Sequence, residues 1–356
     1  MTTTTPTSAR DKQPAYDPLH LTGARLPRWA PGASLAAALA LTAAVFATTP
    51  LRGVGPFVVV ATLVFVVAQT LWSFGTEGRR RAVDRFFTTL VYGAFGIALL
   101  PLVSVAVTVL AKGGGTVNGA FLTHSMRNIG PNDVGGGVYH GMVGTLQQAA
   151  ITGLISIPIA LLVSVYLVEY GRGNLARAVT FFVDVMTGIP SIVAGLFIFT
   201  VWILILDFHR AGFPAALALS ILMIPTVVRS TEEMLKLVPD ELREASLALG
   251  VPKWRTILKV VIPTALPGIV TGIMLGIARV VGETAPLLLL VGATDSINVN
   301  PADGPQASLP MIIFEQAARP QDAAVDRAWG AALVLIAIVM LLNLTARLVA
   351  RFARVR

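Results

Sequence analysis

The stretch STEEMLKLVPDELREASLALGVPKWRTILKVV, residues 230–261, lies between two apolar runs and is rich in charged side chains. Within it, Leu242, Ala245 and Leu249 follow one another at i, i+3 and i+7, which places them on one face of a helix. Gly250 then stands where a helix end needs a residue in the left-handed conformation. Residues 230–261 therefore predict short amphipathic helices joined at an angle, and this segment is called the elbow.

Two further signals refine the ends of the elbow helices. Ser230 and Glu233 have the S-x-x-E spacing of a capping box, which satisfies the free amides at a helix start. Pro252 suits the first turn of a helix because its missing N–H is not needed there. We therefore predict that one helix begins near Ser230 and that another begins near Pro252.

Outside the elbow the composition is that of a membrane protein. The chain has 356 residues, of which 55% are hydrophobic and 13% are charged, and its mean hydropathy is +0.75. There is no cysteine and there are only four histidines, so disulfides and Cys-based metal or redox chemistry are excluded and a metal site is not expected. The net charge of +8 comes without a basic surface patch, so nucleic acid is not an expected partner.

Apolar runs long enough to cross a bilayer core of about 30 Å recur along the chain. They predict an all-α polytopic membrane protein with eight transmembrane helices, which is expected to contact membrane lipid. The predicted spans are approximately residues 33–50, 56–74, 86–111, 142–168, 179–206, 213–228, 262–293 and 329–350.

The distribution of basic residues predicts the orientation. With eight spans, most of the 27 Lys and Arg residues fall on the side that carries the elbow and both chain ends. Cytoplasmic segments carry such an excess, so the N-terminus, the C-terminus and the elbow are predicted to be cytoplasmic. Residues 1–32 are predicted to be a disordered cytoplasmic tail, residues 33–82 a transmembrane hairpin, and residues 83–356 a separate domain.

Arg279 and Glu283 interrupt the seventh predicted span with two charges. Residues four apart share a face of a helix, so the two side chains are expected to touch. An arginine inside a span costs about 2.5–3.5 kcal/mol on insertion scales, and a buried pair does not recover this cost reliably. An arginine fork binds oxyanions through parallel donors, so the pair, with Thr284 beside it, is predicted to line a substrate pathway. A purely structural ion pair is the alternative.

Gly188 and Pro190 interrupt the fifth predicted span. Proline and glycine are frequent causes of sharp kinks in helices. We therefore predict a kink at this position, which acts as a gate or hinge or allows close helix contact.

The residue identities in the elbow resemble a known motif. Glu244, Ala245 and Ser246, with Gly250 four residues further on and Pro263 after Ile262, are similar to the EAA motif of bacterial ABC importer permeases, with serine in place of its second alanine. The resemblance implies that these residues dock on an ATPase subunit and couple its movement to the spans.

Segments elsewhere are similar to the PstA family of phosphate-specific ABC transporter permeases. The segment GETAP, residues 282–286, carries this resemblance, and TGIPSIVAGLF, YLVEY and SLPMIIF agree with it. It implies a six-span importer permease core of the MetI-like fold over residues 83–356, to which the hairpin is additional. It also implies import of inorganic phosphate together with a second permease of the PstC kind, a dimeric ATPase of the PstB kind and an extracytoplasmic binding protein of the PstS kind.

Two alternatives stay open from the residues themselves. One is an importer of another oxyanion, since an arginine does not distinguish phosphate from sulfate. The other is a proton-coupled secondary transporter that uses Glu283, although such a protein has no need of an ATPase-docking elbow. The chain has no GxxxxGK[ST] loop, so we expect no nucleotide site, no enzymatic activity and no cofactor in this chain.

Overall fold

The computed structural model describes residues 26–50 and 52–353, and its regular structure over these residues is entirely helical. Seven of the described helices are long and apolar enough to cross a membrane, or up to eight if one bent pair is a single span. The predicted all-α polytopic fold is confirmed, and the eight predicted spans match these helices when the bent pair is counted as one. Most of the predicted tail, residues 1–25, lies outside the described residues.

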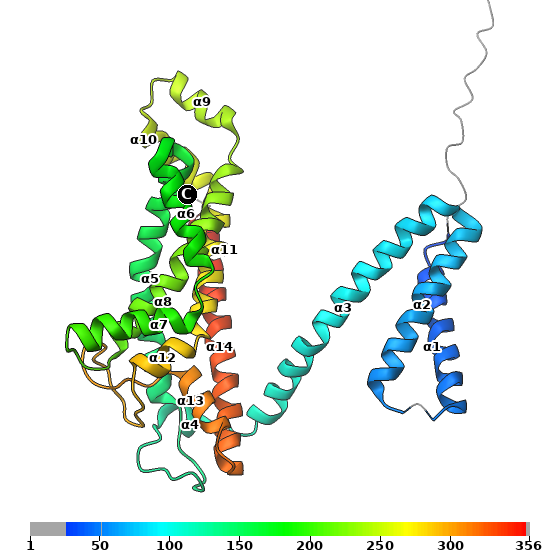
Figure 1. The fold of residues 1–356 in the computed structure, drawn as a ribbon, viewed down its shortest axis with the longest axis horizontal. Coiled ribbons are helices and arrows are strands. Elements are labelled where there is room, and N and C mark those ends of the chain that lie inside the picture. The colour runs from blue at the N-terminus through cyan, green and yellow to red at the C-terminus, as the bar shows by residue number, and fades with distance from the viewer. Residues whose placement is uncertain (1–25, 51, 354–356) are drawn as a thin grey trace, which may run out of the picture. The chain divides into compact units, whose positions relative to one another are not determined.

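The chain divides into two compact units, Met1–Val105 and Ala106–Arg356, and each is described by itself. In the first unit, α1 (Ala30–Thr48) packs against α2 (Val54–Glu77), and α3 (Arg79–Gly113) begins after one residue (Figure 1). The Ser34 hydroxyl donates to Gln69 Oε1 at 2.5 Å, and Arg85 Nε donates to Glu77 Oε2 at 2.5 Å. The predicted hairpin is thus a helix pair joined by polar contacts, while its separation as a domain at residue 82 stays a prediction.

In the second unit, α8 (Gly212–Lys236) is the central helix. Its neighbours include α5 (Tyr139–Val165) and α11 (Ile262–Val281), and α11 in turn contacts α14 (Asp322–Ala353) (Figure 1). Met223, Val227 and Val228 of α8 are fully buried in the main apolar cluster. The other spans keep most of their side chains at the surface of the chain, as expected where lipid or another subunit covers them.

A row of glycines on α11 lets it approach α8 closely. A Cβ on Gly268 would lie 2.1 Å from Met234 Sδ, one on Gly272 would lie 2.1 Å from Ser230 Oγ, and one on Gly276 would lie 3.0 Å from Val227 Cγ2. Small residues at a spacing of four are a common basis of helix contact in membranes. The contact fixes which part of α11 lies beside which part of α8.

Replacing Gly272 by Val should weaken this contact. The added methyl groups have no space beside Ser230, and overpacking of this kind typically costs about 1–3 kcal/mol. We expect a lower thermal unfolding temperature for the purified protein in detergent. Thr271→Val, at the exposed neighbouring position of α11, is the control, and equal stability of the two variants would contradict the close contact.

The fifth predicted span is broken rather than kinked. Its halves are α6 (Gly173–Thr187) and a second helical stretch made of α7 (Ser191–Phe199) and its π-helical continuation Thr200–Ile205, and they meet at 103°. In Figure 1, α7 crosses the direction of α8. Pro190 caps α7 in an extended conformation with ψ 138°, whereas Gly188 has an ordinary φ of −87°. The predicted position of the bend is confirmed, and the helical conformation is interrupted at Pro190, which takes the extended backbone common for proline.

The elbow joins α8 to α11. Its first helix, α9 (Asp240–Ala248), is followed by Gly250 with φ +76°, and α10 (Lys253–Thr256) continues through a π-helical stretch, Ile257–Val261, into α11. The angled pair, the left-handed Gly250 and the helix start after Pro252 are confirmed. Pro263 lies in the first turn of α11 within this continuous helical run.

Two predictions about helix ends are wrong. The capping box at Ser230 does not exist, because α8 continues to Lys236 and the Ser230 hydroxyl donates to the Val227 carbonyl at 3.2 Å. The seventh span does not run to residue 293, because α11 ends at Val281 and a short helix, α12 (Ala285–Leu290), follows after a break. Pro286 in the first turn of α12 explains this break, since proline cannot continue a helix from the preceding turn.

At the other end of the unit, Arg327 of α14 is only 3% exposed. Its guanidinium donates to Gln316 Oε1 of α13 (Leu309–Ala317) at 3.2 Å and to the carbonyl oxygens of a glycine-rich loop. These carbonyls belong to Gly130, Pro131, Asp133 and Gly135. One buried side chain therefore holds this loop.

Candidate functional site

Arg279 lies two residues before the end of α11 and is exposed at the surface of the chain. Its Nη1 donates to the Thr226 hydroxyl at 3.4 Å, and Thr226 is close to the middle of α8. The guanidinium therefore lies at the mid-depth of the most buried span. A single contact of 3.4 Å is a weak hydrogen bond, so most of the five N–H donors are left available.

Glu283 does not form the predicted pair with Arg279. It lies in the break between α11 and α12, where its N–H donates to the Val280 carbonyl at 3.2 Å, and no ion pair joins it to Arg279 in the described part of the chain. The expected contact required an unbroken helix from residue 279 to residue 283, and α11 ends before that. Glu283 and Thr284 are both half-buried, and Thr284 precedes the first residue of α12.

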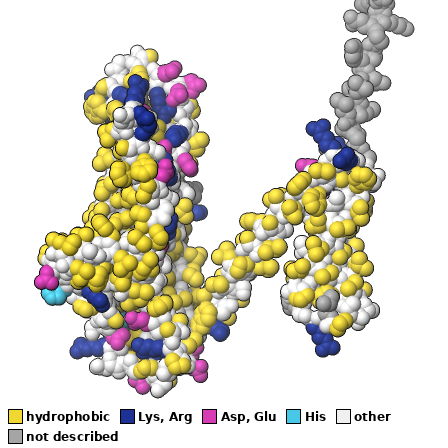
Figure 2. Space-filling view, in the orientation of Figure 1, with side chains coloured by type: hydrophobic (Ala, Val, Ile, Leu, Met, Phe, Trp, Pro, Cys, Tyr) yellow, Lys and Arg dark blue, Asp and Glu magenta, His cyan; other side chains and the backbone are white. Residues whose placement is uncertain are grey.

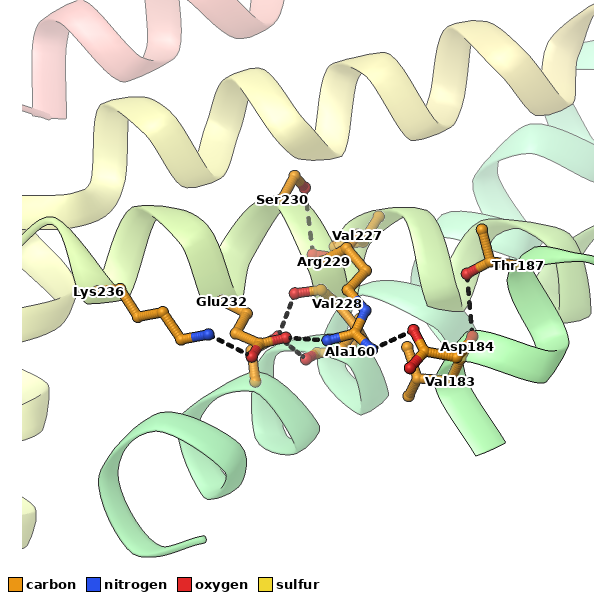
Figure 3. Close-up of polar contacts among 11 residues, drawn as sticks. Ala160, Val183, Asp184, Thr187, Val227, Val228, Arg229, Ser230, Glu232 and Lys236 are labelled. Atoms are coloured by element: carbon orange, nitrogen blue, oxygen red, sulfur yellow. Dashed lines mark hydrogen bonds and ion pairs between the residues drawn. The ribbon is translucent and has the colours of Figure 1, made fainter. Parts of the chain in front are cut away.

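A second group of charges lies further along α8 (Figure 3). Arg229 is ion-paired with Asp184 of α6, and its Nη1 lies 2.7 Å from Glu232 Oε2. Glu232 Oε1 in turn lies 2.7 Å from Lys236 Nζ. The group joins the first half of the broken span to α8 at Arg229, which lies three residues after Thr226.

Sequence analysis did not select Arg229, which counted only as one of the basic residues flanking the sixth span. Arg229, Glu232 and Lys236 have the i, i+3 and i, i+4 spacings of ion pairs on one helix face, and this was the available signal. This spacing was missed because the helix was predicted to end before residue 230.

Thr226, which contacts Arg279, and Arg229 lie about one turn apart on α8, and these three residues are called the polar strip. Residues 226 and 229 are separated by about 4.5 Å along the helix axis, from the rise of about 1.5 Å per residue. Each arginine offers a planar fork that matches two oxygens of a tetrahedral anion. Asp184, whose side chain is 60% exposed, competes with any such anion for Arg229. The strip is therefore suited to hold an oxyanion without binding it permanently.

The predicted coupling residues lie on the exposed side of the elbow. Glu244 and Ala245 are exposed on α9, and Leu242 and Leu249 are 42% and 83% exposed. Ser246, which replaces an alanine of the motif, lies with its hydroxyl 2.9 Å from that of Thr256 and so ties α9 to α10. This side of α9 thus offers apolar and acidic groups to a further subunit.

Arg243 fastens the other side of α9 to the spans. Its Nε lies 3.0 Å from Glu169 Oε1 in Tyr166–Tyr170, the π-helical stretch that follows α5, and it donates to the carbonyls of Leu235 at 2.9 Å and Val238 at 2.5 Å. The Glu169 side chain is only 5% exposed. Arg243 therefore ties α9 to the end of α8 and to the helical stretch that contains Glu169.

Within the described ranges, no group of three or more His, Asp or Glu side chains could hold a metal ion. The chemistry that the site offers is the binding of anions by guanidinium groups.

The chain matches the model of the family described as binding-protein-dependent transport system inner membrane component over residues 156–354. This range contains the polar strip, the broken span and the elbow. The chain therefore belongs to this family of transport permeases, and it is a multi-pass inner membrane protein.

Relatives within the family define a narrower group. The phosphate transport system permease protein PstA 1 of Mycobacterium tuberculosis strain H37Rv is 51% identical over 279 residues, which are 78% of this chain and 90% of the relative. The corresponding PstA of Mycobacterium leprae is 50% identical over 267 residues (75% of this chain and 88% of the relative), and that of Pasteurella multocida is 37% identical over 272 residues (76% and 95%). The chain is thus a member of the PstA permeases.

A solved structure of the methionine ABC transporter MetNI in inward-facing conformations is also similar, with 21% identity, a TM-score of 0.48, and coverage of 61% of this chain and 94% of that chain. The relatives are permease subunits of ABC transporters and not enzymes, and such systems have a separate ATPase and further subunits. The hypothesis of a proton-coupled secondary transporter is therefore wrong.

Proposed function

We propose that the chain is the PstA-type permease subunit of an ATP-driven importer of inorganic phosphate. The observation that carries the proposal is the exposed Arg279 guanidinium at the mid-depth of α8, with one long hydrogen bond to Thr226. The names of its relatives supply the substrate, and an arginine fork supplies the chemistry that binds it.

The phosphate pathway runs along the polar strip beside α8. Arg279 binds the anion first, and Glu283 and Thr284 line the pathway at the break after α11. Arg229 is a second cationic binding position. A partner permease of the PstC kind covers the exposed side of the strip and encloses the pathway. The break at Gly188 and Pro190 is the gate or hinge, because α6 carries Asp184, the group that occupies Arg229 when no anion is present.

ATP hydrolysis enters through the elbow. The coupling segment of the elbow docks on a dimeric ATPase of the PstB kind. It consists of Glu244, Ala245, Ser246, Gly250 and Pro263. A binding protein of the PstS kind delivers phosphate at the opposite side, where Arg327 orders the outer loop. Both chain ends and the elbow are cytoplasmic in this arrangement, which follows the distribution of basic residues.

Labelled-phosphate uptake tests the function directly. Bacteria that lack this chain should lose binding-protein-dependent phosphate uptake, and the intact gene should restore it. Excess unlabelled phosphate should compete, whereas sulfate should not. Uptake that persists without the chain, or that sulfate suppresses equally, would show that the substrate is a different oxyanion or that the chain has another role.

A further inference from the structure

A cavity of about 380 Å³ lies between the elbow and the end of α5. Its wall includes Arg172, Lys236, Arg243 and Lys253 as basic residues and Glu169 and Asp240 as acidic ones. Small-molecule sites in proteins commonly have volumes of about 300–1,000 Å³, so the space is large enough for a ligand. Figure 2 shows Lys and Arg side chains gathered at this end of the second unit.

The charges of the wall are not balanced within the chain. Arg243 pairs with both acidic residues, at 3.0 Å from Glu169 and 3.1 Å from Asp240. Lys253 donates to the Glu169 carbonyl and lies 4.9 Å from the Tyr170 ring centre. Once these contacts are counted, Lys253 and Arg172 still line the space without an acidic partner among the residues that the structure describes.

Arg172 is the least committed of these cations. It is exposed, and the part of the chain that the structure describes gives it neither a hydrogen bond nor an ion pair. It is also the residue directly before α6, whose first amides have no side-chain cap. The positive end of the α6 dipole therefore adds to the field of the guanidinium.

We infer that this cavity is a binding site for a phosphate-bearing anion, separate from the transport pathway. Arg172 supplies a fork for two phosphate oxygens, and the Lys253 and Lys236 ammonium groups supply further donors. The inference rests on the proposed function for the position of the elbow on the cytoplasmic side. Two phosphate sources meet there: free phosphate released by the importer, and the head groups of anionic lipids.

An anion in the cavity would connect three elements at once. Arg172 precedes α6, Lys236 ends α8, and Lys253 begins α10. Because the elbow passes the movement of the ATPase to the spans, an occupied cavity resists that movement. The site therefore couples the cytoplasmic anion supply, or the lipid composition, to the mobility of the elbow.

Hydrogen–deuterium exchange of the complete transporter, in nanodiscs of phosphatidylcholine, tests the site. Inorganic phosphate should slow amide exchange in peptides that cover residues 166–173 and 237–253. Arg172→Gln should raise the phosphate concentration for half-maximal protection about tenfold, the usual consequence of losing one charge-assisted hydrogen bond. Arg177→Gln is the matched control, because Arg177 is exposed on α6 and its guanidinium bonds to Asn174 outside the cavity wall.

A separate experiment tests lipid head groups as the source of the anion. In nanodiscs that contain phosphatidylglycerol, a head group in the cavity should slow exchange of the same peptides without added phosphate, and Arg172→Gln should remove this protection. Protection that depends on added phosphate in both kinds of nanodisc identifies free phosphate as the ligand. No protection by either source, or the same protection in Arg172→Gln as in the unaltered protein, would overturn the inference.

Arg279→Gln separates this site from the transport pathway. Elbow protection should persist in Arg279→Gln at the unaltered phosphate concentration, whatever that variant does to uptake. Normal uptake by Arg279→Gln together with loss of protection in Arg172→Gln would refute the proposed pathway and leave the cavity site standing. Loss of protection in Arg279→Gln would place the signal in the pathway and refute the cavity site.

Discussion

Replacing Arg279 by Gln will abolish phosphate uptake while the transporter still assembles. Glutamine retains a donor for the Thr226 hydroxyl but removes the charge and the fork. Hydrogen bonds to charged groups contribute about 1.5–3 kcal/mol each, so the loss of two of them lowers phosphate binding by at least about 100-fold. Because Arg279 is exposed and has only the 3.4 Å contact, the fold should be little affected.

The measurement is initial uptake of labelled phosphate, with co-purification of the other subunits as the check on assembly. Arg279→Lys should give intermediate uptake, since it keeps the charge without the planar fork. Arg210→Gln is the control, because Arg210 is an exposed arginine outside the polar strip. If Arg279→Gln takes up phosphate as fast as Arg210→Gln, Arg279 is not part of the pathway.

Replacing Glu244 by Lys will uncouple the permease from its ATPase. Glu244 is exposed on α9 and makes no ion pair in the described structure, so a change there should alter stability by less than about 0.5 kcal/mol. A reversed charge at a subunit interface, by contrast, costs several kcal/mol when it meets a like charge. The effect should therefore appear only in the assembled transporter.

Two readouts are needed: the amount of ATPase that co-purifies, and the stimulation of ATP hydrolysis by phosphate-loaded binding protein. One or both should fall in Glu244→Lys. Glu233→Lys is the control, because Glu233 is an exposed glutamate near the end of α8 and outside α9. Full association and full stimulation in Glu244→Lys would show that this part of α9 does not face the ATPase.

Much of the architecture could be predicted because it follows from local signals. Apolar run lengths located the spans, the Gly188 and Pro190 pair located the bend, and Gly250 located the left-handed end of α9. Each of these signals acts within a few residues. The elbow was therefore predicted at the correct position and with the correct internal turn.

The errors arose where packing decided between two local possibilities. Ser230 and Glu233 fit a capping box in isolation, but α8 continues through them because Ser230 packs against Gly272 of α11. The apolar residues from Ile262 to Val291 fit one long span, but the chain turns after Val281 so that α12 packs against α7 and α8. The pairing of Arg229 with Asp184, from residues 45 positions apart, has no local signal at all.

The segment of α8 from Thr226 to Lys236 contains neither glycine nor proline, and Pro225 lies on its far side from the elbow. Chain positions 229 and 236 are thus about 10 Å apart on an uninterrupted helical rod, at about 1.5 Å per residue. In the proposed mechanism, nucleotide-driven closure below the membrane and exchange of partners at Arg229 therefore occur in the same step, because no flexible joint separates them.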